Sequence, residues 1–418
     1  MSRQHITIGL FGFGCVGKGL WDVLEQTPGL KANIRRICVK SHDKPRPIPS
    51  EHFTFQKDDL LNDPEINVVV ELIDDAEAAF SIVATAMRNG KGVVSANKKM
   101  IAEHLEELLF LQRECNVPFL YEAACCASIP IIRNLEEYYD NDLLVSLEGI
   151  VNGSTNYILT RTSSDHISYD EALKQAQEKG YAESNPVLDV EGYDAKFKLI
   201  ILLAHAFGIV EKPENIYNLG IQRIGALELR LASEKGYKIK LMAHAQRLDQ
   251  NHVIAFVMPQ FINTNSRFYN VDDVFNGVQT ETSFADKQFF MGKGAGAFPT
   301  ASAVLSDISA LSYDYRYEYK KMAQQSFFLT DHFILEVFVR FKNRDDVPSA
   351  DFISIAEKYR SNEGHYIVGK IRFDKLRSSS WAGNPDVSIL LTPGSVAESC
   401  EIPCTPDDCV CVQTTSVL

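Results

Sequence analysis

Short apolar runs alternate with longer amphipathic stretches over the first 130 residues of the chain. The amphipathic stretches, residues 76–89 and 101–114, repeat apolar side chains at the spacing of one helix face. The apolar runs are too short for helices and predict strands, at residues 6–10, 36–40, 67–72, 92–95 and 118–121. Strands that alternate with helices are typical of a parallel sheet with helices on both faces. Residues 1–130 are therefore predicted to form a doubly wound α/β domain.

The pattern changes after Pro130, where helical periodicity mixes with strict alternation. Helices are predicted at residues 131–139, 168–179 and 194–207, and strands at residues 144–151, 237–247 and 252–259. Alternation is typical of antiparallel strands that cover a core with one face. We expect an α+β domain over residues 131–299, followed by a helix within residues 300–325 that returns to the first domain.

The rest of the chain, residues 326–418, repeats this mixture on a smaller scale. The pattern predicts a strand at 333–341, a helix near 351–359 and strands at 366–373 and 387–391. We expect a small C-terminal α+β domain. Its tail holds four of the nine cysteines at a spacing that does not match the paired ligands of zinc sites, so they are predicted to be ordinary thiols: Cys400, Cys404, Cys409 and Cys411.

Composition and charge exclude several classes of protein. The chain has 418 residues, of which 45% are hydrophobic and 23% charged, as in a globular protein of two or three domains. Its 42 basic and 55 acidic residues give a net charge of −13, which opposes binding to nucleic acid or to an anionic membrane. The longest apolar run, residues 199–210, is interrupted by His205 and is shorter than the ~20 residues of a membrane span. Without a signal-peptide pattern, the sequence predicts a cytoplasmic protein that binds neither nucleic acid nor membrane.

A glycine triplet follows the first predicted strand and opens the first helix. Gly12, Gly14 and Gly17 have the spacing at which glycines allow a tight turn and a close approach of the backbone to a pyrophosphate. The triplet predicts a Rossmann-type dinucleotide site that includes the intervening residues Phe13, Cys15 and Val16. A plain strand-to-helix turn is the alternative.

Charge after the second strand bears on which dinucleotide is bound. An acidic residue there binds the ribose 2′-hydroxyl of NAD(H) and repels a 2′-phosphate, but this chain has Lys40, followed by further basic residues. The sequence therefore favours NADP(H), with NAD(H) as the alternative cofactor. The alternative for Lys40 itself is a solvated loop lysine.

Three further segments carry candidate chemistry. Asn97 and Lys98 follow a predicted strand at the edge of the sheet where doubly wound folds bind ligands. Asp194 and Lys198 are four residues apart on one predicted helix, which fits either a surface ion pair or a lysine poised by a carboxylate for proton transfer. Gly294 begins a second loop through which a ligand can approach the backbone.

Together the motifs resemble those of homoserine dehydrogenases, from residue 6 to about residue 320. The resemblance lies in seven segments in the family's order: GLFGFGCVGKGL, VVVELI, VVSANKK, YEAACCASIPII, GIVNGSTNYIL, GYAESNPVLDVEGYDAKFKL and GKGAGAFPTASAV. It implies that Lys98 is the second active-site lysine, and that Lys198 is the acid/base lysine with Asp194 as its carboxylate partner. It also implies that Glu183 receives the substrate's ammonium group, with Asp189 as a further substrate-binding residue, and that the chain forms a homodimer.

The family's monovalent-cation site maps by the same resemblance to Glu122, Cys125, Ala127 and Ile129, so a bound sodium ion is a further expectation. The chain departs from the family here, because Cys126 and Ala127 stand where relatives have glycines. Many relatives also end in a regulatory domain. Residues 333–391 have part of the order of strands and helices of that domain, which leaves a regulatory role of the C-terminal domain open.

The sequence thus predicts an enzyme that interconverts L-homoserine and L-aspartate 4-semialdehyde with NAD(P)(H), in threonine and methionine biosynthesis. Two alternatives stay open: another amino-acid semialdehyde oxidoreductase, and a catalytically silent dinucleotide sensor. The sensor is disfavoured because it has no need for a paired acid and base.

Overall fold

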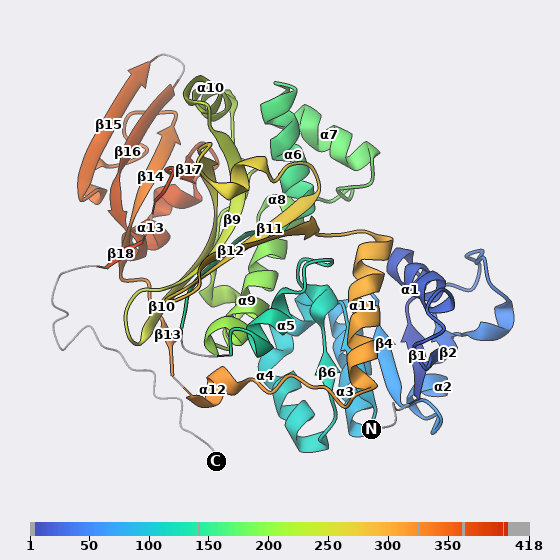
Figure 1. The fold of residues 1–418 in the computed structure, drawn as a ribbon. Helices are drawn as coiled ribbons and strands as arrows, with labels where there is room; N and C mark the ends of the chain where they lie inside the picture. Colours follow the sequence, from blue (N-terminus) through green and yellow to red (C-terminus); the bar gives the residue numbers. More distant parts are fainter. Residues whose placement is uncertain (1–4, 141–142, 325, 362–363, 396, 400–418) are drawn as a thin grey trace.

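The computed structural model describes residues 5–140, 143–324, 326–361, 364–395 and 397–399. The strands in this part of the chain form two sheets (Figure 1). The first is parallel and six-stranded, in the order β3-β2-β1-β4-β5-β6. Its strands are β1 (Ile6–Phe11), β2 (Ala32–Cys38), β3 (Phe53–Thr54), β4 (Val68–Glu71), β5 (Gly92–Ser95) and β6 (Phe119–Leu120). This strand order is that of a Rossmann fold, so the predicted doubly wound sheet is confirmed.

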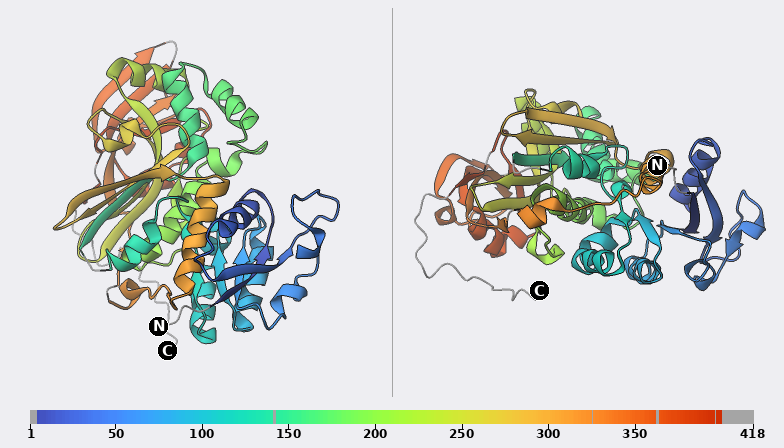
Figure 2. Two further views of the ribbon diagram at one scale, coloured as in Figure 1. Left: turned by 45° about the vertical axis from the view of Figure 1, so that its right-hand side comes forward. Right: turned by 60° about the horizontal axis from the view of Figure 1, so that its bottom comes forward.

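Helices flank the parallel sheet and link it to the rest of the chain. They are α1 (Cys15–Glu25), α2 (Asp58–Leu61), α3 (Ala76–Arg88), α4 (Lys98–Cys115) and, from much later in the sequence, α11 (Ala297–Leu311). Helix α11 packs along α1, where a side chain at Gly19 would lie 2.9 Å from the carbonyl oxygen of Ala297. The right-hand view of Figure 2 shows α11 between the blue N-terminal region and the remainder of the molecule.

The second sheet is mixed and joins the middle of the chain to its C-terminal part. Its main path runs β12-β11-β7-β9-β10-β17-β14-β16-β15 among the described residues. The strands of the middle region are β7 (Leu144–Ile150), β9 (Lys238–Arg247), β10 (His252–Ile262), β11 (Phe275–Thr282) and β12 (Asp286–Lys293), and those of the C-terminal part are β14 (Phe333–Phe341), β15 (Ser354–Ser361), β16 (Gly364–Arg372) and β17 (Ser388–Leu391).

Helix α9 (Tyr193–Phe207) is the central element of the middle region. Every side chain from Asp194 to Phe207 is buried, because α9 packs on β9 and β10 as well as on α4 and α5. The other helices of this region are α5 (Ile131–Glu137), α6 (Gly153–Ser164), α7 (Tyr169–Glu178), α8 (Val187–Val190) and α10 (Ala226–Lys235). The apolar core that surrounds α9 continues into the parallel sheet, so α9 is held by both parts of the molecule.

The C-terminal strands continue the second sheet beyond β10 and enclose an apolar core with side chains of β10. Phe256 of β10 stacks on Phe333 of β14, which stacks in turn on Phe373 of the short helix α13 (Phe373–Ser378). These rings belong to a separate apolar core. The described residues also include the helix α12 (Lys320–Gln324) and the short strands β8 (Tyr217–Asn218), β13 (Phe328–Leu329) and β18 (Glu398–Ser399).

The predicted helix near residues 351–359 is wrong, because this segment forms the edge strand β15. Its centre, Ala356 to Lys358, is rich in helix formers, but the segment pairs with β16 as an antiparallel hairpin. Its side chains from Ile353 to Arg360 are all exposed, so no periodic burial marks a strand in the sequence. Tertiary pairing here overrides local propensity. The tail cysteines lie outside the described residues.

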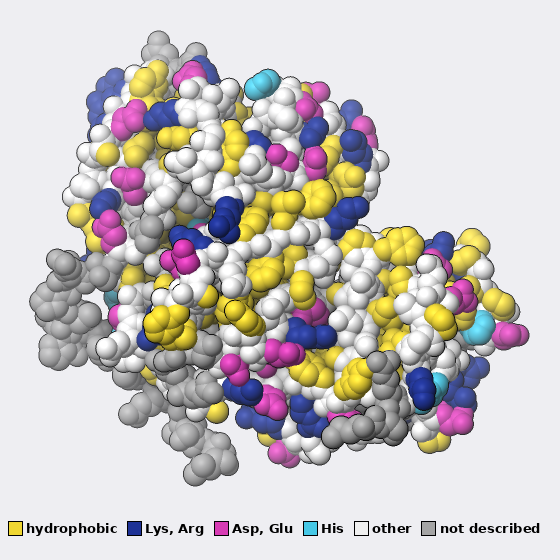
Figure 3. All heavy atoms as spheres, viewed as in Figure 1, with side chains coloured by type: hydrophobic (Ala, Val, Ile, Leu, Met, Phe, Trp, Pro, Cys, Tyr) yellow, Lys and Arg dark blue, Asp and Glu magenta, His cyan; other side chains and the backbone are white. Residues whose placement is uncertain are grey.

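None of the described helices is both long and apolar enough to cross a membrane. Hydrophobic side chains gather over the centre of the face shown in Figure 3, and charged groups collect mainly toward its edges.

Candidate active site

A cavity of about 630 Å³ lies where the carboxyl edge of the parallel sheet meets the middle region. Its walls come from the start of α1, the loop after β4, the start of α4, the start of α6, the loop between α7 and α8, and α9. The structure brings seven of the residues singled out in the sequence to this one cavity: Val16, Lys98, Glu183, Asp189, Asp194, Lys198 and Gly294.

The Asp194 carboxylate is bound by two lysines at the cavity wall. Its Oδ1 atom lies 2.8 Å from Nζ of Lys98, and its Oδ2 atom lies 2.8 Å from Nζ of Lys198. Lys98 reaches it from the first residue of α4, whereas Lys198 lies one turn along α9. Lys198 also donates to the carbonyl oxygen of Val151 at 2.6 Å. We call Lys98, Asp194 and Lys198 the lysine cluster.

The environment favours the charged forms of Asp194 and Lys98. Burial would raise the pKa of Asp194, but the ammonium groups of Lys198 and Lys98 hold it well below its usual range. The Asp194 carboxylate in turn raises the pKa of Lys98. The side chains of Asp194 and Lys198 are 6% and 7% exposed, whereas that of Lys98 is 42% exposed, so the cluster meets solvent through Lys98. A fixed ammonium pair of this kind stabilises negative charge that develops on a bound oxygen.

Asn152 is a member of this site that the sequence reasoning did not select. Its Nδ2 group donates to Asp194 and to Asp189, both at 2.7 Å, while its Oδ1 atom caps α6 by accepting from the amide of Thr155. Burial and the nearby Asp194 charge raise the pKa of Asp189. Asn152 directly follows the strand predicted at residues 144–151, and this position in the sequence gives no indication of its tertiary partners.

Glu183 lies on the cavity wall but outside the hydrogen-bond network of the lysine cluster. Its side chain is exposed, and its main-chain oxygen accepts from the side chain of Gln177 at 3.0 Å. Glu183 and Asp189 thus present two carboxylates to the same cavity.

The glycine loop fits a dinucleotide pyrophosphate. Gly12 has φ of +93°, and a side chain there would lie 2.5 Å from the carbonyl oxygen of Leu72. A side chain at Gly17 would lie 2.4 Å from the Gly12 carbonyl oxygen, but one at Gly14 would meet no atom within 4 Å. No side chain caps the N-terminus of α1, so its first amides are left to bind an anion in the open space beside Gly14.

Other residues assigned to the cofactor have different surroundings. Phe13 packs edge-on against Phe53, and Cys15 is exposed at the first turn of α1. Lys40 lies in the exposed loop after β2, which ends two residues earlier than predicted. Asn97 does not line the cavity, because its side chain caps α4 through the amide of Met100 and donates to the Ile73 carbonyl oxygen. Asn97 therefore fixes where α4 begins, and with it the backbone of Lys98.

The four residues of the expected cation site lie behind the cavity, between β6 and α5. The Glu122 carboxylate accepts from the amides of Ile132 and Arg133, and the Ile129 carbonyl oxygen accepts from the amide of Ile131. Ala127, like Cys126 beside it, has positive φ, and the Cys125 thiol lies 3.8 Å from the Lys198 carbonyl oxygen. No group of three or more His, Cys, Asp or Glu side chains within the described ranges could hold a metal ion.

Comparisons with known proteins show the family of the chain. Residues 12–122 match the family model described as the NAD binding domain of homoserine dehydrogenase, and residues 130–309 match that described as homoserine dehydrogenase. The homoserine dehydrogenase of Synechocystis sp. is 38% identical over 313 residues, which is 72% of each chain. That of Bacillus subtilis is 35% identical over 74% of this chain and 73% of its own. The chain belongs to the homoserine dehydrogenase family.

Solved structures extend the similarity beyond the matched segments. The homoserine dehydrogenase of Thiobacillus denitrificans superposes with a TM-score of 0.82 at 29% identity, over 94% of this chain and 99% of that one. A hyperthermophilic archaeal homoserine dehydrogenase in complex with NADPH superposes with a TM-score of 0.66 at 26% identity, over 75% of this chain and 99% of that one. The chain is thus an NAD(P)-dependent oxidoreductase of the homoserine dehydrogenase type.

Proposed function

We propose that the lysine cluster is the acid/base centre for the interconversion of L-homoserine and L-aspartate 4-semialdehyde. One observation carries this proposal: a single carboxylate, Asp194, holds two ammonium groups 2.8 Å away at the wall of the cavity that the glycine loop also borders. When bound, the nicotinamide dinucleotide supplies or accepts the hydride at the carbon that becomes the alcohol or the aldehyde.

Lys198 and Lys98 act on the oxygen of that carbon. In the reducing direction the carbonyl oxygen gains an electron pair, and Lys198 donates a proton to it as the hydroxyl forms. Lys98 stays charged and stabilises the developing oxyanion, because its pKa is raised by Asp194. In the oxidising direction Lys198 takes the proton of the substrate hydroxyl. Asp194 orients both lysines throughout. The cluster carries one net positive charge while Lys198 is protonated, and no net charge once Lys198 has given its proton to the substrate oxygen.

Glu183 and Asp189 recognise the amino-acid end of the substrate. Their carboxylates line the cavity that contains the lysine cluster, and a carboxylate pairs with the substrate ammonium through charge-assisted hydrogen bonds. Binding at this end orients the alcohol before chemistry.

The test is absorbance at the reduced nicotinamide band with L-homoserine and each oxidised cofactor. Homoserine-dependent reduction supports the proposed function. Reduction with a different amino-acid semialdehyde or alcohol, and none with homoserine, would favour the second oxidoreductase. Cofactor binding without reduction of the cofactor by any of these substrates would favour the silent sensor.

We also propose that NADP(H) is used at least as well as NAD(H). Lys40 stands where an acid would exclude a 2′-phosphate, and Arg46 in the same loop lies over the Phe53 ring and bonds the loop carbonyls of Ser41 and Lys44. Lys40→Asp should weaken NADPH binding roughly five- to tenfold through an exposed charge change, and should leave NADH within twofold. Fluorescence titration of both cofactors checks this prediction. Equal losses for the two cofactors would contradict the charge argument.

Four further statements stay predictions from the sequence. They are the division into a nucleotide-binding domain (1–130), a substrate and dimerisation domain (131–299) and a C-terminal domain (326–418), the homodimer, the cytoplasmic location and the sodium ion. Both carboxylate oxygens of Glu122 accept hydrogen bonds from backbone amides. No step of the proposed reaction above depends on a cation.

A further inference from the structure

A buried carboxylate lies in the parallel sheet close to the active-site cavity. Glu71, the last residue of β4, is fully buried at the carboxyl edge of that sheet. Burial raises the pKa of its carboxyl to about 7, and the charge of Asp74 adds to this rise. The groups that influence its charge most are Ser95, Ile73 and Asp74, none of which is a cation. A carboxylate buried in this way costs stability, so its hydrogen bonds indicate what it is kept for.

The two oxygens of Glu71 bind two different segments of the active site. Oε1 accepts from the amide of Ile73, in the loop after β4, at 2.6 Å. Oε2 accepts from the hydroxyl of Ser95, the last residue of β5, at 2.6 Å. One buried side chain therefore links the ends of two neighbouring parallel strands.

Asn97 closes these contacts into a ring. Its amide donates to the Ser95 hydroxyl oxygen at 3.1 Å, and its side chain donates to the Ile73 carbonyl oxygen at 3.0 Å. We call Glu71, Ile73, Ser95 and Asn97 the Glu71 ring. Its four hydrogen bonds are buried or partly buried, so water does not readily replace them.

Both segments held by the Glu71 ring line the active-site cavity. The lining includes the loop after β4 and the segment after β5, through Leu72, Ile73, Asp74, Ala96 and Lys98. Lys98 directly follows Asn97, and its ammonium group lies 2.8 Å from the Asp194 carboxylate. The backbone position from which Lys98 reaches Asp194 is therefore set by the Glu71 ring.

The loop after β4 also contacts the glycine loop. The amide of Leu72 donates to the Phe11 carbonyl oxygen at 2.9 Å, and a side chain at Gly12 would lie 2.5 Å from the Leu72 carbonyl oxygen. With so little space between them, a shift of the loop after β4 displaces the glycine loop. The Glu71 ring thus connects the cofactor side of the cavity to the lysine cluster.

We infer that Glu71 is a positioning residue, which holds the loop after β4 and the backbone of Lys98 in the arrangement that cofactor binding and hydride transfer require. Glu71 does not itself line the cavity. It acts through Ile73 on the cofactor side, and through Ser95 and Asn97 on Lys98. The effect on hydride transfer rests on the proposed function, whereas the effect on cofactor binding does not.

The experiment compares Glu71→Met with Glu71→Gln. Methionine has a similar volume but cannot replace the two hydrogen bonds, whereas the glutamine oxygen can still accept from the Ile73 amide. Because the neutral form of Glu71 is accessible near pH 7, an uncharged amide of the same shape should be tolerated. The Kd for NADPH, from fluorescence titration, should rise at least about tenfold in Glu71→Met and stay within about threefold of wild type in Glu71→Gln.

The rate of hydride transfer is measured in the first turnover with saturating NADP⁺ and homoserine, per NADPH-binding site. It should fall at least about tenfold in Glu71→Met and stay within about threefold in Glu71→Gln. A purely structural role would lower the amount of folded protein and leave the rate per site unchanged. A folded Glu71→Met protein with affinity and rate within about twofold of wild type would overturn the inference.

Lys91→Met is the matched control for Glu71→Met. Lys91 is also buried, and it donates to the carbonyl oxygens of Asp63 and Ile66 at 2.6 and 2.7 Å, at the opposite edge of the same sheet. Urea unfolding should show that both methionine variants are less stable than wild type. NADPH affinity and the rate per site should stay within about twofold in Lys91→Met. Equal losses of affinity and rate in the two variants would indicate general damage to the domain and overturn the inference.

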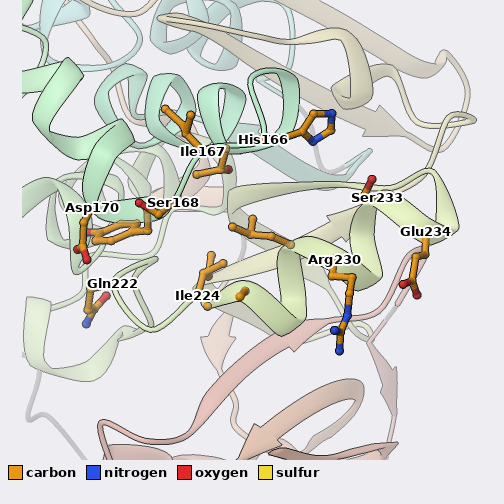
Figure 4. A pocket seen from close by; sticks show the side chains of 14 residues that line it. His166, Ile167, Ser168, Asp170, Gln222, Ile224, Arg230, Ser233 and Glu234 are labelled. Carbon is orange, nitrogen blue, oxygen red and sulfur yellow. The ribbon is translucent and has the colours of Figure 1, made fainter. Parts of the chain in front are cut away.

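A second pair of variants tests the ring at a smaller side chain, and it decides the question if Glu71→Met does not fold. Ser95→Ala should weaken NADPH binding and slow hydride transfer at least about fivefold. In the control, Ser168→Ala, the lost hydroxyl also accepts a backbone amide, that of Glu171 at 3.3 Å. Ser168 lies at a separate cavity of about 620 Å³ between α7 and α10, which shares no lining residue with the active-site cavity (Figure 4). Equal effects in the two serine variants would overturn the inference.

The double variant Glu71→Met/Ser95→Ala distinguishes a ring from two independent contacts. Its losses should exceed those of the more affected single variant by no more than about twofold, because both changes break the same ring. Losses that multiply would overturn the inference. Absence of homoserine oxidation in the wild type would count against the proposed function alone, because NADPH titration reports on the ring without turnover.

Discussion

Helix α9 carries a polar cluster at each end, and the two clusters differ in what they can do. At its start lies the lysine cluster. Near its end, Nδ1 of His205 lies 2.6 Å from the Glu136 carboxylate, and Nε2 lies 2.8 Å from the hydroxyl of Tyr121, which in turn lies 2.7 Å from the hydroxyl of Tyr319. We call these four residues the histidine cluster.

The lysine cluster and the histidine cluster differ in their access to a cavity. The lysine cluster reaches solvent through Lys98 and lines 630 Å³ of space, whereas the His205 side chain is fully buried and that of Glu136 is 6% exposed. Burial would raise the pKa of Glu136, but the hydrogen bond from His205 and two backbone amides lower it. A sealed network of this kind joins α5, α9 and the strand end at Tyr121. The histidine cluster therefore fixes α9 in place, whereas the lysine cluster can exchange a proton with a substrate.

The largest expected effect is a loss of turnover that distinguishes two lysines on α9. Lys198→Ala should lower kcat about 100-fold or more, because it removes the group that exchanges a proton as hydride transfers. Lys196→Ala is the matched control, since Lys196 is also buried on α9 but lies over the Tyr193 ring, away from the cavity. Steady-state homoserine oxidation measures both. Similar losses in the two variants would point to damage to α9 and not to chemistry.

A smaller loss of turnover is expected for Asp194→Asn. The amide keeps the shape of the side chain but removes the charge that orients both lysines, so kcat should fall about tenfold, less than in Lys198→Ala. NADPH affinity, measured by fluorescence titration, should change little. A loss of cofactor affinity equal to the loss of kcat would place Asp194 in binding.

For the histidine cluster we expect a loss of stability with little loss of turnover. His205→Leu leaves the buried Glu136 carboxylate and Tyr121 hydroxyl without their shared partner, which should lower the free energy of unfolding by about 2–4 kcal/mol. The kcat of the folded protein should stay within about threefold of wild type. Urea unfolding and turnover of the same preparation test both statements. A stable variant with kcat lowered about 100-fold would contradict the structural role.

The smallest effect is a pH dependence of stability. The folded pKa of Asp194 is below its ordinary value near 3.8, so its contribution to stability is present above that value and is lost as pH falls through the folded pKa. The pKa of Lys98 is raised above 10.5, so its contribution is lost as pH rises through that folded value. The difference in free energy of unfolding between wild type and Asp194→Asn should therefore be largest near about pH 7 and shrink below about pH 4. A difference that does not vary with pH would contradict the charge of Asp194.

The lysine cluster could be predicted from the sequence better than the histidine cluster. Asp194 and Lys198 are four residues apart on one helix, so their pairing follows from helix geometry alone. Lys98 joins them only through the packing of α4 on α9, and the role of Asn152 depends on the contact between the start of α6 and α9. Asn97 illustrates the same limit, because its position at the end of a strand fits both a ligand contact and the helix cap that it forms.

The histidine cluster left no pattern in the sequence. Tyr121, Glu136, His205 and Tyr319 span almost 200 positions, and no regular spacing along the chain relates the four. The error at β15 has a related cause, since an exposed edge strand has no buried face to give it a period of two. Parallel strands buried on both faces have a stronger signal, which is why the order of strands and helices in the first 130 residues could be predicted.

The measurement that tests the account most directly is the rate of hydride transfer in the first turnover, with Lys198→Ala and His205→Leu compared side by side. Each protein is saturated with NADP⁺ and mixed with homoserine, and the rise at the reduced nicotinamide band is followed. The account predicts a first turnover about 100-fold slower in Lys198→Ala and within about threefold of wild type in His205→Leu. A Lys198→Ala protein that stays folded, binds NADP⁺ and transfers hydride at the wild-type rate would contradict it.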